Sequence, residues 1–82
     1  MAPTIGRTVS FILVDGERTL PLVVTRVWSA TTVNGILLTD GSNDRGQIPN
    51  RPDFSGEHTL WLTSITQGDS PGNWKWPERA ET

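Results

Sequence analysis

The chain has 82 residues, of which 34% are hydrophobic, with no cysteine, one histidine and a formal net charge of -2. This composition excludes disulfides, thiolate zinc sites and histidine-rich metal sites, and it predicts no cofactor. The acidic balance argues against duplex nucleic acid as a partner, and the longest apolar runs are far shorter than the ~18–20 residues of a membrane span.

The first strand is predicted from the stretch RTVSFILV, in which Val9, Phe11 and Leu13 share one face. Asp15 and Gly16 follow, and these residue types suit a tight hairpin turn because glycine tolerates a positive φ. We therefore expect the next strand to pair antiparallel with this one.

The second strand is predicted from TLPLVVTRVWS. Pro21 has no N–H, so it belongs at a strand start, an edge or a bulge. Leu22, Val24, Arg26 and Trp28 are each two residues apart and should share a face. If the two aliphatic residues point inward, the arginine must leave the core near the barrel mouth and the tryptophan closes that mouth.

The third segment, VNGILLTD, contains Asn34-Gly35, which is either a tight turn or a bulge that enters a short strand over residues 36–39. Residues 40–57 are rich in Gly, Asn, Asp and Pro, a composition that cannot bury enough apolar area to offset its ordering entropy. We expect a long polar loop there, and its length suggests a function.

The last strands are predicted from HTLWLTSITQ, where Leu60 and Leu62 oppose Trp61, and from the short NWKWP. A strongly bent antiparallel sheet that closes on itself hides its edges. The predicted fold is all-β: one small five-stranded antiparallel barrel, SH3-like or OB-like, over residues 1–77, followed by a disordered tail over 78–82.

Catalytic and metal-binding patterns are weak. His58 is the only imidazole, and its neighbour Thr59 should point to the opposite face of a strand. The loop acids Asp40, Asp44 and Asp53 lack the ligand spacing of a calcium loop. We therefore predict that the protein is not an enzyme and binds no metal.

Arginines and tryptophans form the most informative set. Arg26 and Trp28 share a face, as do Trp74 and Trp76, and an arginine over an indole suits a nucleotide whose base stacks while the guanidinium binds phosphate. The alternative is that the tryptophans fill a small core or an oligomer interface. The predicted ligand-binding residues are Arg7 and Arg26 for phosphate, Trp28, Trp74 and Trp76 for stacking, and Asn34 for a base edge.

Five blocks of the chain, PTIGRTV, TRVW, VNGILLTDG, TLWLTS and PGNWKWP, resemble a family of short, mostly uncharacterised proteins of tailed bacteriophages. Members of this family typically begin with P-T-I-G-R and end with W-x-W-P. The resemblance implies a phage protein, and by looser analogy some small phage β-proteins are oligomeric sponges for nucleotide-like host immune signals.

Two functions are expected from these observations. The first is a non-enzymatic homo-oligomer that sequesters a small nucleotide-like anion in the host cytoplasm. The second is a structural or decoration protein of the virion, or an inhibitor that binds a host protein through the tryptophans and the loop at 40–57. The opening MAPTIGRTV lacks the plan of a signal peptide, which agrees with either location.

Overall fold

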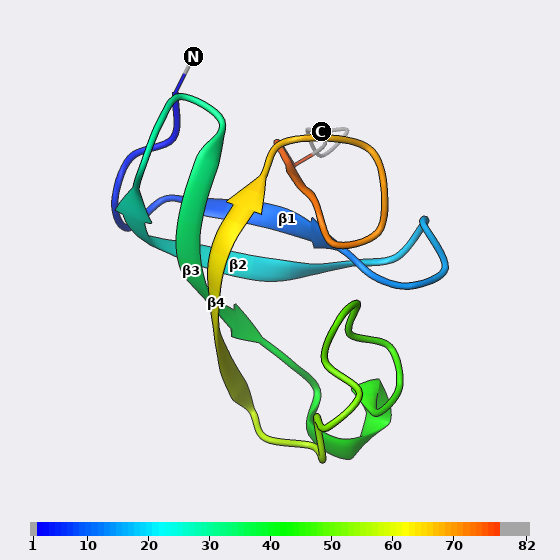
Figure 1. Ribbon diagram of the computed structural model, residues 1–82. Coiled ribbons are helices and arrows are strands. Elements are labelled where there is room, and N and C mark those ends of the chain that lie inside the picture. The colour runs from blue at the N-terminus through cyan, green and yellow to red at the C-terminus, as the bar shows by residue number, and fades with distance from the viewer. Residues whose placement is uncertain (1, 78–82) are drawn as a thin grey trace, which may run out of the picture.

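The alternating segments of the chain form a single five-stranded sheet in the computed structural model, which describes residues 2–77 (Figure 1). The elements are β1 (Thr8–Ile12), β2 (Thr19–Val27), β3 (Thr32–Leu38), the 3-10 helix η1 (Gly41–Asp44), β4 (Thr59–Thr66) and β5 (Trp74–Lys75). All the sheet pairs are antiparallel, in the order β4-β3-β2-β1-β5. The prediction of an all-β fold is confirmed, and the expected tail at 78–82 lies outside the described residues.

The sheet curls strongly into a half-barrel, and its first four strands form a meander rather than the Greek key of an OB barrel. A bridge between Gln67 and Trp74, with a 3.0 Å bond from the Gly68 N–H to the Trp74 carbonyl, links the end of β4 to β5. This bridge brings the two outer strands of the sheet together at one end only.

Two bulges sit on either side of β3 at Asn34 and Gly35. On β2 the pairing skips Thr25, and on β4 both Thr63 and Ser64 lie opposite Asn34. Bulges increase local twist and bend a strand, so two of them at one level explain how so short a sheet curls. The Asn34-Gly35 pair therefore lies at the bulges, as one of the two sequence alternatives has it, and forms no turn. The predicted strand over 36–39 is too short, because β3 already begins at Thr32.

The inner face of the curled sheet holds the hydrophobic core. Gly35 lies on this face, where a Cβ would stand 2.8 Å from Leu22 Cγ. The absence of a side chain at this position allows β2 and β3 to pack closely across the bend. The buried cluster consists of Val9, Phe11, Leu13, Leu22, Val24, Val33, Leu37, Ile48, Phe54, Leu60, Leu62 and Trp74.

The segment 40–57 is a loop apart from η1, as the sequence predicts, but it buries more apolar surface than its composition suggests. Ile48 and Phe54 are 4% and 3% exposed and belong to the core cluster, and the Asp44 carboxylate is buried and accepts a 2.6 Å bond from the Asp40 N–H. These two side chains complete the core on the side that the half-barrel leaves open, and a bond from the Val14 N–H to the Gln47 carbonyl also ties the segment to the sheet. No helix within residues 2–77 has the length and apolarity to cross a membrane.

Candidate functional site

The Arg26–Trp28 pair lies on the outer face of the sheet. The guanidinium carbon of Arg26 is 4.4 Å from the centroid of the Trp28 ring, and 55% of Trp28 is exposed. The expectation that both residues share the face of Leu22 and Val24 is wrong. The bulge at Thr25 reverses the alternation, so both point outward and neither closes the barrel mouth.

Asn34 holds the Trp28 indole in place from beneath. Its Oδ1 accepts hydrogen bonds from Trp28 Nε1 at 2.9 Å, from Thr63 Oγ1 at 3.0 Å and from the Ser64 N–H at 2.8 Å. An indole N–H and a backbone N–H can only donate, so the amide orientation is fixed. Asn34 is 6% exposed, and its oxygen is fully used within the fold rather than offered to a base.

A second cluster forms where β5 meets the start of β1. Arg7 lies 5.2 Å from the Trp76 ring centroid, and Trp76 meets Trp74 edge-to-face at 5.3 Å. Trp74 is fully buried in the core, and its Nε1 donates a 2.9 Å bond to the Thr31 carbonyl. The two indoles share a face as expected, but neither face of Trp74 is accessible to a ligand.

The six predicted ligand-binding residues thus fall into two groups of three. The first, here called the outer platform, consists of Arg26, Trp28 and Asn34. The second, here called the end cluster, consists of Arg7, Trp74 and Trp76. Only the outer platform leaves an indole largely open to solvent.

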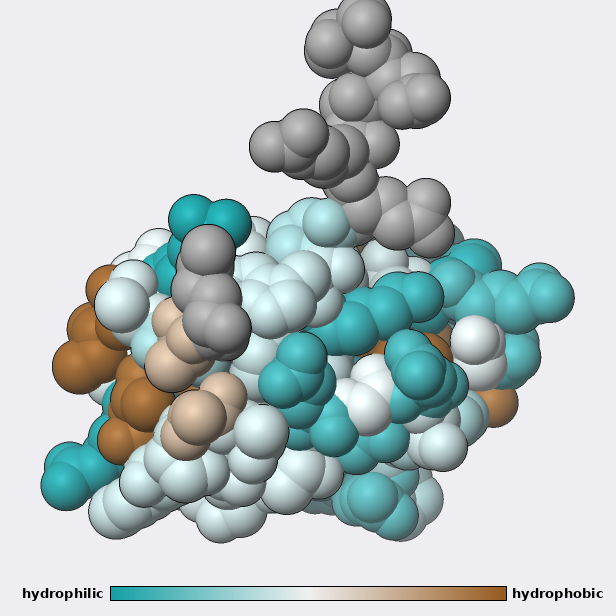
Figure 2. Space-filling model, turned by 90° about the horizontal axis from the view of Figure 1, so that it is seen from above, coloured by the Kyte–Doolittle hydropathy of each residue, from teal (hydrophilic) through white to brown (hydrophobic). Residues whose placement is uncertain are grey.

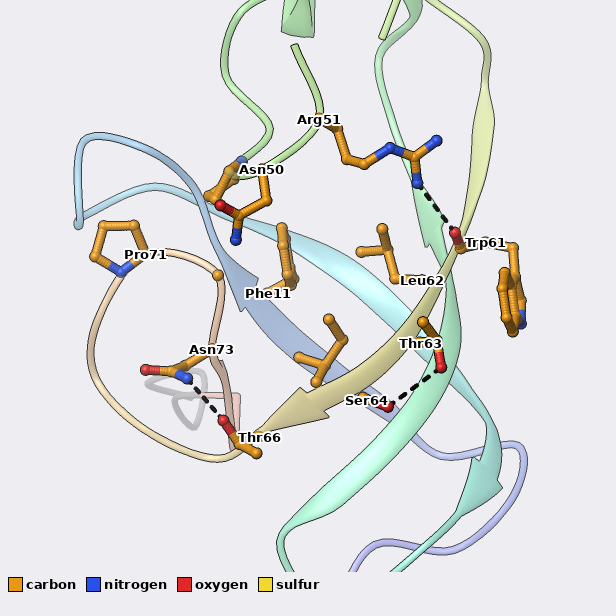
Figure 3. Close-up of a pocket in the computed structure, with 13 residues that line it drawn as sticks. Phe11, Asn50, Arg51, Trp61, Leu62, Thr63, Ser64, Thr66, Pro71 and Asn73 are labelled. Atoms are coloured by element: carbon orange, nitrogen blue, oxygen red, sulfur yellow. Dashed lines mark hydrogen bonds between the residues drawn. The ribbon is translucent and has the colours of Figure 1, made fainter. Parts of the chain in front are cut away.

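A cavity of about 420 Å³ has none of these six residues in its lining, although Thr63 and Ser64, which bond to Asn34, are part of its wall (Figure 3). It opens between β4, the loop at 49–51 and the loop at 71–73. Its floor is Phe11 and Leu62, and the Trp61 ring points away from it. It is lined by Phe11, Pro49, Asn50, Arg51, Trp61, Leu62, Thr63, Ser64, Ile65, Thr66, Pro71, Gly72 and Asn73. Sequence reasoning did not find this cavity, because its walls come from distant segments; the cluster of Asn and Pro in both loops was the available signal.

The arginines of the outer platform and the end cluster are not part of an ion pair within the described residues. Within residues 2–77 the ion pairs are Arg18–Asp15 at 3.3 Å and Arg51–Asp53 at 3.4 Å, so neither platform nor end-cluster arginine has a carboxylate partner there. Backbone N–H bonds from Glu17 and Arg18 lower the pKa of Asp15. A bond from the Ser55 hydroxyl lowers the pKa of Glu57.

Hydrophobic surface is distributed unevenly. Figure 2 shows a largely hydrophilic upper face with hydrophobic residues gathered toward one side. The exposed large hydrophobic residues are Ile5, Val14, Trp28, Leu38 and Trp61. Trp61 lies on the outer face, where it pairs with Ile36 of β3, which pairs with Val23 of β2. The outer face therefore carries two half-exposed tryptophans, on different strands.

The chemistry that this arrangement permits is recognition of an aromatic or anionic group. In the described part of the chain, no three His, Asp or Glu side chains gather as a metal site would require. Arg26 offers a planar set of donors, and the free face of Trp28 offers a stacking surface. Comparison with protein-family models, with curated proteins and with solved structures finds no match. The resemblance to phage proteins stays a prediction.

Proposed function

We propose that the protein is a non-enzymatic binding protein whose outer platform binds a small, anionic, nucleotide-like ligand. The observation that carries this proposal is the Arg26 guanidinium stacked on a half-exposed Trp28, with no carboxylate partner among residues 2–77. A cation that is already positioned loses less side-chain entropy when an anion arrives.

The two platform residues would divide the work of recognition. Arg26 covers one face of the indole and directs its donors to a phosphate, while a base stacks on the exposed remainder of Trp28. Asn34 acts as a positioning residue, because its bond to Trp28 Nε1 fixes the ring. Arg7, Trp74 and Trp76 lie in the end cluster, away from the platform, and take no part in this binding.

The biological setting is proposed from the sequence. A phage protein that assembles as a homo-oligomer in the host cytoplasm could hold many copies of a nucleotide-like immune signal without degrading it. Sequestration of this kind requires no catalytic step.

Isothermal calorimetry against a panel of cyclic and linear nucleotides tests the proposal. At about 100 μM protein we expect at least one nucleotide to bind, with a Kd of micromolar order. Arg26→Ala should weaken that binding at least tenfold. The matched control is Arg18→Ala, which removes the same charge from an arginine already paired with Asp15. Silence across the panel, or equal losses in both variants, would overturn the proposal.

A protein partner is the second candidate, and the exposed Trp28 and Trp61 on one outer face favour it. Tryptophan and arginine are the residues most enriched at binding hot spots. In that case Trp61→Ala weakens the interaction as much as Trp28→Ala, whereas a nucleotide site near Arg26 tolerates it. The presence of the protein in purified virions would favour a structural or decoration role over sequestration.

A further inference from the structure

The cavity beside β4 has an unusual wall, because one side of it is the open edge of a strand. In the described part of the chain, β4 is an outer strand of the sheet and its paired neighbour along its length is β3 alone. Within residues 2–77, no main-chain group outside β3 bonds to β4 between Trp61 and Thr66. An open strand edge of this kind presents backbone donors and acceptors that can pair with another chain.

The register shows which groups face the cavity. The Thr39 N–H donates to the His58 carbonyl, so the main-chain groups of His58 point toward β3. Main-chain groups alternate in direction along an antiparallel strand, so those of Trp61 and Thr63 point away from β3. Arg51 confirms this direction, since its Nη1 reaches the Trp61 carbonyl over a long 3.5 Å contact. The groups left open are the N–H of Trp61 and both main-chain groups of Thr63.

The opposite wall carries side-chain amides. Asn50 directs its amide into the cavity in Figure 3 and makes no side-chain hydrogen bond within the described residues. Asn73 closes one end, where its Nδ2 donates to Thr66 Oγ1 at 3.2 Å. A side-chain amide offers both a donor and an acceptor, which matches the two polar groups of a peptide unit.

We propose that this groove binds a short extended peptide segment of another protein as an added strand against β4. The segment would pair its backbone with Trp61 and Thr63 on one side and with the Asn50 amide on the other. The edge from Trp61 to Thr66 has six residues at roughly 3.3 Å each, which is long enough for a five-residue segment. The groove would thus recognise the backbone of the bound segment, and every second side chain of that segment would point to the apolar floor.

The same geometry argues for one strand rather than a second copy of this protein. The loops at 49–51 and 71–73 stand beside the β4 edge, so another folded copy would bring its own loops against them. A single extended segment avoids that conflict. Phe11 and Leu62 form the floor, so every second residue of the segment should be apolar.

Nuclear magnetic resonance of the whole protein tests this proposal with blocked five-residue peptides that alternate threonine with valine, leucine or phenylalanine. We expect at least one peptide, at about 2 mM, to shift the amide signals of Trp61 and Thr63 with saturation. The matched control is the same peptide N-methylated at the amides that face β4, which cannot donate to the edge. It should cause no such shifts.

Two variants sharpen the test. Asn50→Gly removes the amide and keeps the backbone, because Asn50 has a φ of 64° that glycine adopts freely; we expect roughly fivefold weaker peptide binding. Arg26→Ala, which removes the cation–π contact and none of the hydrogen bonds around Asn34 and Thr63, should weaken nucleotide binding and leave peptide binding unchanged, which separates this proposal from the nucleotide site. The proposal is overturned if no peptide shifts these amides, if the N-methylated peptide binds equally well, or if the shifts follow protein concentration as self-association would require.

Discussion

Two arginine–tryptophan pairs in one small sheet have similar geometry and different surroundings. Arg26 lies 4.4 Å from Trp28, and Arg7 lies 5.2 Å from Trp76. Trp28 rests on the polar Asn34 and remains 55% exposed. Trp76 packs against the core, edge-on to the buried Trp74.

The difference shows that the support beneath an indole decides what the pair can do. A hydrogen bond to Asn34 orients Trp28 at the surface while leaving most of the ring accessible, so the outer platform can contact a ligand. Contact with Trp74 makes the end cluster an extension of the core, and its arginine covers apolar surface. We therefore expect the end cluster to contribute to stability and the outer platform to contribute to the proposed binding.

The largest expected effect separates the two clusters directly. Trp74→Ala should lower the free energy of unfolding by about 3–5 kcal/mol, because it leaves a cavity in the core. It also leaves the Thr31 carbonyl without its donor. Chemical denaturation measures the loss.

Trp28→Ala is the matched control for that measurement. It removes the same side chain from the surface, so we expect a loss of about 1 kcal/mol or less, mainly from the bond to Asn34. Equal destabilisation by both substitutions would contradict the division between platform and end cluster.

The next effect concerns the support of the outer platform. Asn34→Ala leaves three donors without their shared acceptor, on Trp28, Thr63 and Ser64, and should cost about 2 kcal/mol. Denaturation measures this loss, and near-ultraviolet circular dichroism follows the indole.

Asn34→Asp keeps an oxygen at the same place and should recover most of the lost stability. If the alanine variant is as stable as the original chain, Asn34 does not hold the platform and the positioning role is wrong.

The strands themselves were predictable because alternation survives wherever the sheet is regular. Val9 and Phe11 on β1, and Leu60 and Leu62 on β4, point inward as their period of two requires. The pattern fails at Arg26, since one extra residue at Thr25 reverses the faces. A bulge depends on the neighbouring strand, so local periodicity cannot reveal it.

The candidate sites were predictable only in part, for a related reason. Short spacing places Arg26 beside Trp28, and the structure brings them together. The partnership of Trp28 with Asn34 depends on the meander, which returns β3 beside β2. The cavity depends on Phe11 of β1 and on the segments 49–51, 61–66 and 71–73, and no motif in the sequence links them.

A smaller effect compares the two arginines. Arg26→Ala and Arg7→Ala each remove one cation–π contact, and each should lower the free energy of unfolding by about 1 kcal/mol or less. Nucleotide binding should distinguish them: the first variant loses at least tenfold in affinity, and the second stays within about twofold. Calorimetry measures both, and equal losses of affinity would mean that the ligand spans the two clusters.

The smallest effect is acid sensitivity, and it should leave both clusters unchanged, because neither pair contains a carboxylate within residues 2–77. Asp15 Oδ1 accepts the N–H groups of Glu17 and Arg18, which holds its pKa below the ordinary value of 3.8. The charged form is therefore favoured by folding. Its stabilising effect is complete above the unfolded pKa and is lost as the pH falls through the lower folded pKa.

Melting temperatures between pH 6 and 2 measure this dependence, with the range set by ordinary carboxylate pKa values of roughly 4. Asp15→Asn keeps an oxygen for the turn and removes the charge, so its stability should decline less steeply below about pH 4 than that of the original chain. Glu57, whose pKa is also lowered, accounts for part of the remaining slope. Since the turn joins β1 to β2 far from either indole, Trp28 and Trp76 should keep their fluorescence until the sheet unfolds. A change in fluorescence before unfolding would show that a carboxylate acts on one of the arginine–tryptophan pairs. The two pairs would then differ in their electrostatic surroundings as well as in the residue that packs beneath the indole.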